Sequence, residues 1–175
     1  STKGGRPELF STLTMENISI AKNGVILYHD KKGYEDPWRK HQKSPIARDI
    51  WLKSNGKFAK QTTFAGEDRS PVWTSDEKSF FYLSEQDGTF NIYRRSLSSS
   101  DKQITHHKGN PVRFLTASSA DLLCYGYDGE IYTVKEGGEP QKVNISITTD
   151  NDAPSLVRQI KSWGATEISV SPDAK

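Results

Sequence analysis

Four histidines are the side chains in this sequence best suited to acid–base or metal chemistry: His29, His41, His106 and His107. His29 precedes Asp30, and a carboxylate can orient an imidazole as a general base, but no nucleophile motif accompanies the pair. His106 and His107 are adjacent, so on a strand their rings would point to opposite faces and could not share one ion. We interpret these two as solvated loop residues. Motifs of the GxSxG, HExxH, CxxC and Walker types are absent, so the sequence predicts no catalytic residue and no cofactor.

The remaining histidine, His41, belongs to a basic segment with one aromatic residue, Trp38-Arg39-Lys40-His41. This segment is the candidate contact site. The segment lies in a long insert at 31–48, and long insertions are where function tends to collect. Its cations could hold a peptide carboxylate through charge-assisted hydrogen bonds, or the loop could pack on a neighbouring domain. Alternatively, the loop folds back on its own repeat, with Trp38 as its anchor and the charges in water. The residues alone leave these three interpretations open.

Acidic and sulfur ligands do not indicate a metal site. Four aspartates, Asp76, Asp87, Asp128 and Asp173, occur one to a turn, and side-chain bonds to the turn backbone explain this spacing better than calcium does. Cys124 is the one cysteine, which excludes an internal disulfide and a cysteine-based zinc site. We therefore expect no bound metal.

The stretch 66–93 shows the pattern that the rest of the chain repeats. Apolar strands at 71–73, 79–84 and 90–93 are separated by Asp, Gly and Ser turns. Strands of about five residues broken by such turns indicate an antiparallel meander. Further strands that we expect on this pattern lie at 17–20, 25–28, 49–52, 60–64, 102–105, 110–115, 121–125, 130–134 and 141–145.

A repeat of roughly 40 residues with four strands is typical of a β-propeller blade. We predict an all-β fold, a partial propeller of about three four-stranded antiparallel blades with incomplete blades at both ends. The predicted divisions are the end of a preceding blade (1–14), three blades (15–66 with the insert 31–48, 67–109 and 110–149), a linker (150–164) and the first strand of a further blade (165–175). Such an arc exposes two blade faces, so we expect it to self-associate through its open blade edges.

The composition gives no support for two classes of partner. The 24 basic and 22 acidic residues give a net charge of +2, which argues neither for nucleic acid nor for an anionic membrane as a partner, so we expect no binding to nucleic acid. No apolar run approaches the roughly 18 residues of a membrane helix, so we expect no membrane insertion.

Two features resemble a known family. PVWTSDEK at 71–78, followed by FFYLS at 80–84, resembles the WD40-like blade signature of TolB-like and tricorn-type propellers, P-x-W-S-P-D-G-K and then a strand. The insert (YEDPWRKH at 34–41, then RDIW at 48–51) and SWGATEISVSPD at 162–173 resemble more specifically the tricorn-like serine proteases of bacteria. The sequence departs from the signature at Thr74-Ser75, which lacks the proline, at Glu77, which replaces the glycine, and throughout 116–120.

The resemblance implies an exported or periplasmic serine peptidase as the parent protein, with a PDZ-like domain and a catalytic core beyond Lys175. No catalytic residue of that family falls within the chain. The implied function is a non-catalytic propeller segment that gates or positions peptide substrates, with the peptide or protein substrate and the parent's remaining domains as partners. The alternative is a TolB-like periplasmic propeller that binds a protein or ligand and has no attached peptidase. The absent motifs argue against the fragment itself being a hydrolase.

Overall fold

The computed structural model describes residues 4–7, 9–34, 39–41, 43–97 and 101–148. The chain divides into a unit of residues Ser1–Val143 and a second unit, Asn144–Lys175. All twelve strands found in the described ranges belong to the first unit. No helix long and apolar enough to cross a membrane occurs in these ranges. Trp38, the predicted linker at 150–164 and the predicted strand at 165–175 lie outside the described residues.

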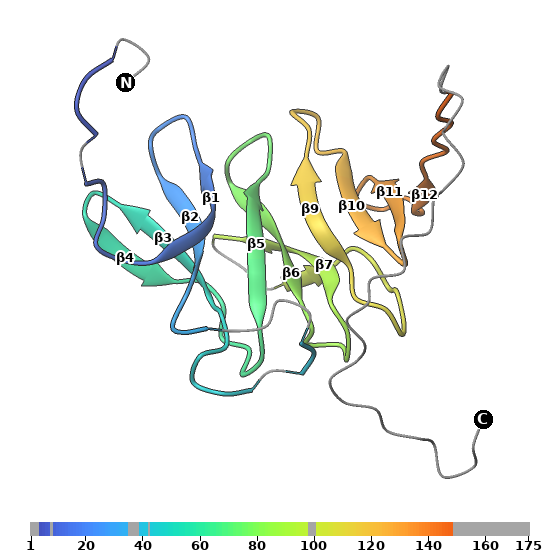
Figure 1. The fold of residues 1–175 in the computed structure, drawn as a ribbon, viewed down its shortest axis with the longest axis horizontal. Coiled ribbons are helices and arrows are strands. Elements are labelled where there is room, and N and C mark those ends of the chain that lie inside the picture. Colours follow the sequence, from blue (N-terminus) through green and yellow to red (C-terminus); the bar gives the residue numbers. More distant parts are fainter. Residues whose placement is uncertain (1–3, 8, 35–38, 42, 98–100, 149–175) are drawn as a thin grey trace, which may run out of the picture. The chain divides into compact units, whose positions relative to one another are not determined.

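The strands form three four-stranded antiparallel sheets, each in simple sequence order (Figure 1). The first blade comprises β1 (Met15–Ile20), β2 (Ile26–Asp30), β3 (Ile50–Ser54) and β4 (Lys57–Lys60). The second comprises β5 (Asp68–Trp73), β6 (Ser79–Ser84), β7 (Asn91–Ser96) and β8 (Asp101–Gln103). The third comprises β9 (Arg113–Ala117), β10 (Leu123–Tyr127), β11 (Glu130–Val134) and β12 (Gln141–Lys142). The predicted all-β partial propeller is confirmed.

Strand alternation explains why the blades pack face to face. Successive side chains on a strand point to opposite faces, so Phe80 and Tyr82 of β6 pack against the first blade, whereas Phe81 and Leu83 pack against the third. All six residues of β6 are buried because both faces of this middle blade are covered. The core therefore consists of two interblade layers, one at each junction.

The turn after each first strand contains a residue with a left-handed backbone at the same place. These residues are Gly24, Glu77 and Asp121, with φ of +81°, +56° and +55°. The glycine of the blade signature suits this conformation because it has no Cβ to clash. Glu77 adopts it without being glycine, and its carboxylate accepts a 2.9 Å hydrogen bond from the Lys22 backbone N–H. The departure from the signature at Glu77 thus leaves the turn geometry intact.

Each first strand also carries a β-bulge with a left-handed residue. Asn17, Ser70 and Phe114 have φ of +47°, +55° and +57°, and the pairing register shifts at each of these sites. A bulge adds local twist and redirects side chains. Because β5 contacts both β1 and β9, the three bulges lie along neighbouring strands (Figure 1).

The fourth strands are shorter than the sequence pattern predicts. We expected strands at 60–64 and 102–105, but β4 ends at Lys60 and β8 at Gln103. In both blades a buried threonine ends the ladder: the hydroxyl of Thr62 accepts from the Ile50 N–H at 3.1 Å, and that of Thr105 from the Ile92 N–H at 2.9 Å. A side-chain oxygen thus replaces a backbone partner at the blade's outer edge.

Candidate binding groove along the first strands

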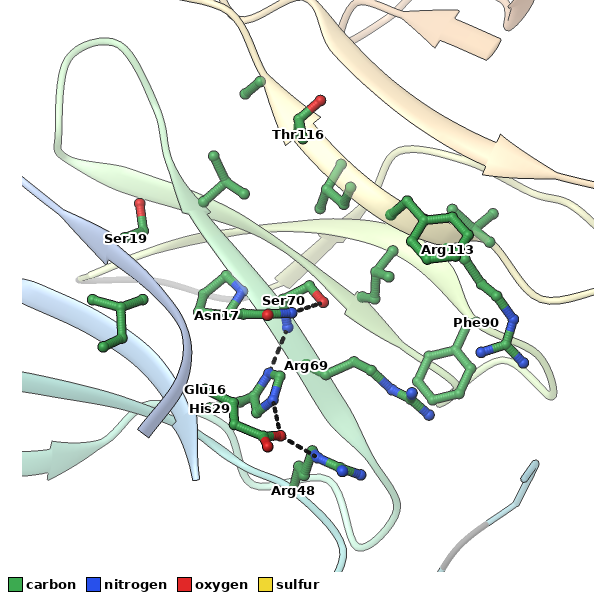
Figure 2. A pocket seen from close by; sticks show the side chains of 18 residues that line it. Glu16, Asn17, Ser19, His29, Arg48, Arg69, Ser70, Phe90, Arg113 and Thr116 are labelled. Carbon is green, nitrogen blue, oxygen red and sulfur yellow. Dashed lines mark hydrogen bonds and ion pairs between the residues drawn. The ribbon is translucent and has the colours of Figure 1, made fainter. Parts of the chain in front are cut away.

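A groove of about 740 Å³ runs along the first strands of the three blades. Figure 2 shows β1, β5 and β9 side chains directed into it. Its wall is largely apolar, with contributions from Ile18, Pro71, Val72, Leu83, Val112, Phe114, Leu115 and Ala117. The volume lies in the range of ligand-binding clefts, about 300–1,000 Å³. The blade repeat thus builds a concave surface from one strand of each blade.

Three arginines give the groove a basic end. Arg48 precedes β3, Arg69 lies on β5 and Arg113 begins β9. The guanidinium groups of these residues lie at the same end of the groove, near the Phe90 ring (Figure 2). The Arg69 guanidinium carbon is 4.2 Å from the centre of that ring, which is cation–π geometry.

A buried carboxylate holds two of the arginines. Glu67 is fully buried, and its Oε1 accepts from Arg48 Nη1 at 2.6 Å and lies 3.3 Å from Arg69 Nε. Burial is the main cause that lowers the pKa of Arg69, and the charge of Glu67 works in the opposite direction. Glu16, which also lines the groove, lies 3.6 Å from Arg48 Nε through its Oε2, so Arg48 has a carboxylate partner on the groove side as well as behind the wall.

His29 and Glu16 form the polar centre of the groove. The His29 Nδ1 accepts from the Ser70 backbone N–H at 3.0 Å, so its Nε2 carries the proton and faces Glu16 Oε2 at 3.3 Å. Burial lowers the pKa of His29 to about 4, although the Glu16 carboxylate opposes this. A hydrogen bond from Lys31 is the largest cause of the lowered pKa of Glu16. His29 is therefore neutral near pH 7, and both ring nitrogens have partners.

The side chains of His29 and Asp30, the pair noted in the sequence, each have other hydrogen-bond partners. The partner of the ring is Glu16 and not Asp30, whose carboxylate accepts from the Trp51 indole N–H at 3.1 Å and the Asp49 backbone N–H at 2.8 Å. Neither imidazole nitrogen is left to activate a nucleophile. The geometry suits a rigid polar wall for a ligand rather than a catalytic dyad.

The described part of the insert reaches the second blade. Lys40 Nζ donates to the Gly109 carbonyl at 2.7 Å, and the His41 N–H donates to the buried Glu85 carboxylate at 2.7 Å. The ends of the insert instead contact their own blade, where Lys32 Nζ bonds Asp49 at 2.6 Å. The negative charge of Glu85 also raises the pKa of Arg69, against the larger effect of burial. Arg39, Lys40 and His41 are not among the residues that line the groove, and Trp38 falls outside the described residues.

The interpretation of the histidine pair as solvated loop residues is wrong for one member. His106 is exposed, but the His107 ring stacks on Tyr127 with 3.8 Å between ring centroids. Its Nε2 is 2.9 Å from the Tyr125 hydroxyl, and burial lowers its pKa. The tyrosines come from the next blade, so the local sequence does not reveal this packing.

Of the three turn aspartates that the structure describes, one makes the predicted bond to the turn backbone. Asp76 accepts from the Lys78 backbone N–H at 3.0 Å, which is the expected turn bond. Asp87 and Asp128 instead accept from the side chains of Gln103 and Asn110, and Asp173 lies outside the described residues. Within the part of the chain that the structure describes, no three His, Cys, Asp or Glu side chains gather in a way that could hold a metal ion.

The residues that give the groove its polarity were not predicted from the sequence: Glu16, Arg48, Glu67, Arg69 and Arg113. They are spread over three blades, and only Glu67 and Arg69 lie close together in the sequence, so no local spacing links the whole set. One signal was present, because Glu16, Arg69 and Arg113 each occupy the position just before the bulge residue of their strand. Aligning the repeats on that position would have placed three charged side chains along one surface.

Comparisons with known proteins support the fold. No family model and no curated protein matches the sequence. Among solved structures, the crystal structure of the tricorn protease is similar over 77% of this chain and 13% of that chain, with a TM-score of 0.63 and 20% identity. A putative TolB from Agrobacterium tumefaciens is similar over 81% of this chain and 53% of that one, with a TM-score of 0.65 and 18% identity.

A third similar structure is TolB from Acinetobacter baumannii, with a TM-score of 0.56, 19% identity, and coverage of 76% of this chain and 33% of that chain. The chain spans 13% to 53% of the length of these three structures. Both groups named in the resemblance are represented, and at these identities the likeness shows the propeller fold.

Proposed function

We propose that this chain is a non-catalytic propeller segment of a tricorn-like serine protease, in which its groove positions extended peptide substrates for a catalytic core elsewhere in the parent protein. One observation carries the proposal: an apolar groove along three blades has a cluster of arginines at one end. An extended peptide offers apolar side chains to the wall and a carboxylate to the cations. The parent is then an extracytoplasmic peptidase.

The insert tip has a defined part in this proposal. Lys40 and His41 are bonded to the second blade, and in this proposal the tip of the insert meets the ligand at the end of the groove. Arg39, Lys40 and Trp38 are the side chains proposed to meet the peptide or a neighbouring domain of the parent. The proposal assigns no catalytic residue to this chain.

A TolB-like binding propeller without peptidase is the second candidate. The similarity to the putative TolB of Agrobacterium tumefaciens, with a TM-score of 0.65, favours it. The same groove would then hold a segment of a partner protein. The two candidates share the binding surface and differ in whether the parent protein hydrolyses what it binds.

Peptide binding tests the proposal directly. Fluorescein-labelled heptapeptides with a free C-terminal carboxylate are titrated with the chain and followed by fluorescence anisotropy. We expect binding that weakens several-fold in Lys40→Ala and in the C-terminally amidated peptide, while Lys57→Ala, an exposed lysine on β4, serves as the matched control. Absence of binding, or equal effects of the two lysine variants, contradicts the proposal. Hydrolysis by this chain that one Ser→Ala change abolishes would show that the chain is itself an enzyme.

Hydrolysis by the parent protein separates the two candidates. The intact parent is incubated with the peptides that bind, and the products are identified by mass spectrometry. Cleavage supports the protease segment. Binding without cleavage by the parent supports the TolB-like module.

A further inference from the structure

We infer that Asn17 binds the main chain of the peptide: its carboxamide accepts from the N–H and donates to the C=O of one extended residue, while Ser70 holds the carboxamide in position. The inference rests on the proposed function and deepens it, because it says which part of the peptide this stretch of the groove recognises. The two side chains are polar and uncharged, and they lie next to apolar wall residues such as Ile18 and Pro71.

The side chains of Asn17 and Ser70 meet at the junction of the first two blades. Asn17 Nδ2 donates to Ser70 Oγ at 2.8 Å, and both residues line the groove (Figure 2). Each occupies the left-handed bulge position of its strand, β1 or β5, with φ of +47° and +55°. A bulge redirects side chains, and backbone strain of this kind clusters at ligand-binding sites. The two bulges bring both features to one place in the groove.

Asn17 keeps hydrogen-bonding capacity after this contact. A carboxamide carries two N–H groups and an oxygen that accepts, and the bond to Ser70 uses one N–H. The Asn17 side chain makes no other hydrogen bond within the ranges that the structure describes, and the residue is exposed. A donor and an acceptor therefore remain side by side, and they match the C=O and the N–H that every residue of an extended peptide offers, proline excepted.

The charged centre of the groove supports this pair instead of competing with it. Both ring nitrogens of His29 are occupied, by the Ser70 N–H at 3.0 Å and by Glu16 at 3.3 Å. Glu16 in turn accepts from Lys31 at 2.8 Å. One hydrogen-bonded chain thus runs from Glu16 across two blades and ends at Asn17. Because the carboxamide is already held, less conformational freedom is lost when a ligand binds it.

The pair defines the ligand by its backbone. Main-chain N–H and C=O groups are already paired in helices and sheets, so only an extended segment can offer both to Asn17. Main-chain hydrogen bonds give affinity without selecting a side chain, and the apolar wall takes the side chains on either side. The ligand class is therefore an extended polypeptide segment of varied sequence.

The first test locates the main-chain contact on the peptide. Fluorescein-labelled heptapeptides with a free C-terminal carboxylate are prepared with each amide in turn replaced by an ester, which removes one N–H and leaves the side chains unchanged. Loss of one hydrogen bond corresponds to about twofold to tenfold weaker binding. We expect fluorescence anisotropy to show this loss for an ester at one position. If no ester weakens binding to the intact chain, the inference is overturned.

The second test assigns that contact to Asn17. Asn17→Gly and Ser70→Gly each remove a side chain, and glycine accepts the positive φ at both positions. Asn55→Gly is the matched control, because Asn55 has a φ of +48° in the exposed turn between β3 and β4 and does not line the groove. We expect the parent peptide and the sensitive ester to bind Asn17→Gly equally. The difference between the two peptides should shrink in Ser70→Gly and persist in full in Asn55→Gly.

The ratio of the two affinities separates binding from a structural role. If the Asn17–Ser70 contact only joins the two blades, Asn17→Gly weakens both peptides alike and the ratio survives; this result overturns the inference and leaves the proposed function standing. An undiminished ratio in Ser70→Gly contradicts its positioning role. No binding by the intact chain refutes the proposed function, and the inference with it. If urea unfolding shows that Asn17→Gly does not fold, the ester series on the intact chain and Ser70→Gly still decide between these outcomes.

Discussion

Asp68 allows a sharp test of the junction between the first and second blades. Asp68 is 1% exposed. Burial raises its pKa from the ordinary 3.8 to about 7, and the nearby hydroxyls of Ser84 and Thr62 offset part of that effect. The charges of Asp49 and Asp101 raise it further.

The pKa difference sets the sign and size of the expected effect. Below pH 3.8 both folded and unfolded states hold the proton, so the carboxyl does not affect stability. Between about pH 4 and 7 the unfolded chain releases the proton and the folded chain retains it, so folding becomes less favourable as the pH rises. The difference between 3.8 and about 7, at about 1.4 kcal/mol per pH unit, corresponds to about 4 kcal/mol above pH 7.

Asp68→Asn removes the titrating group while nearly preserving its shape. The free energy of unfolding, measured by urea titration at pH 4, 5, 6, 7 and 8, should be similar in both proteins at pH 4. It should be about 4 kcal/mol greater in the variant at pH 8. Comparison of the two proteins at each pH cancels the contribution of other groups, and Asp87→Asn, an exposed carboxylate, controls for the lost charge. A difference that is constant with pH, or a destabilised Asn variant at pH 8, would refute the reasoning.

Three further predictions follow from other contacts. Glu67→Gln removes the buried counter-charge shared by the guanidinium groups of Arg48 and Arg69, leaves Arg48 only its longer 3.6 Å pairing with Glu16, and should lower the free energy of unfolding by about 3 kcal/mol, measured by urea titration. The imidazole of His29, whose pKa is lowered to about 4, should remain neutral down to about pH 5 in an NMR titration, and acid should destabilise the fold as the pH falls from 6.5 towards 4. The average mass in sedimentation should rise with concentration because side chains such as Ile20, which is 65% exposed, lie uncovered on the first blade; a clean monomer at high concentration would contradict this.

Strands and turns were predictable because their signals are local. The apolar runs at 79–84 and 130–134 match β6 and β11 at both ends, since each is bounded by turn residues. The outer strands were less predictable. Whether a residue such as Thr62 continues the ladder or caps it depends on Ile50, on the neighbouring strand.

The groove was not predictable in the same way. Arg48 and Glu67 meet across nineteen positions of sequence, and the Ser70 N–H bonds His29 across forty-one. Such pairs follow from how one blade is placed on the next, which composition and spacing do not encode. The error at His107 has the same origin, because its partners Tyr125 and Tyr127 belong to the following blade.

The three bulge residues also have a consequence for protein engineering. Asn17, Ser70 and Phe114 share one backbone conformation although their side chains are an amide, a hydroxyl and an aromatic ring. The scaffold thus already tolerates unlike chemistry at three sites on one concave surface. A combinatorial library randomised at these sites would vary recognition while leaving the hydrogen-bonded ladders of the blades unaltered.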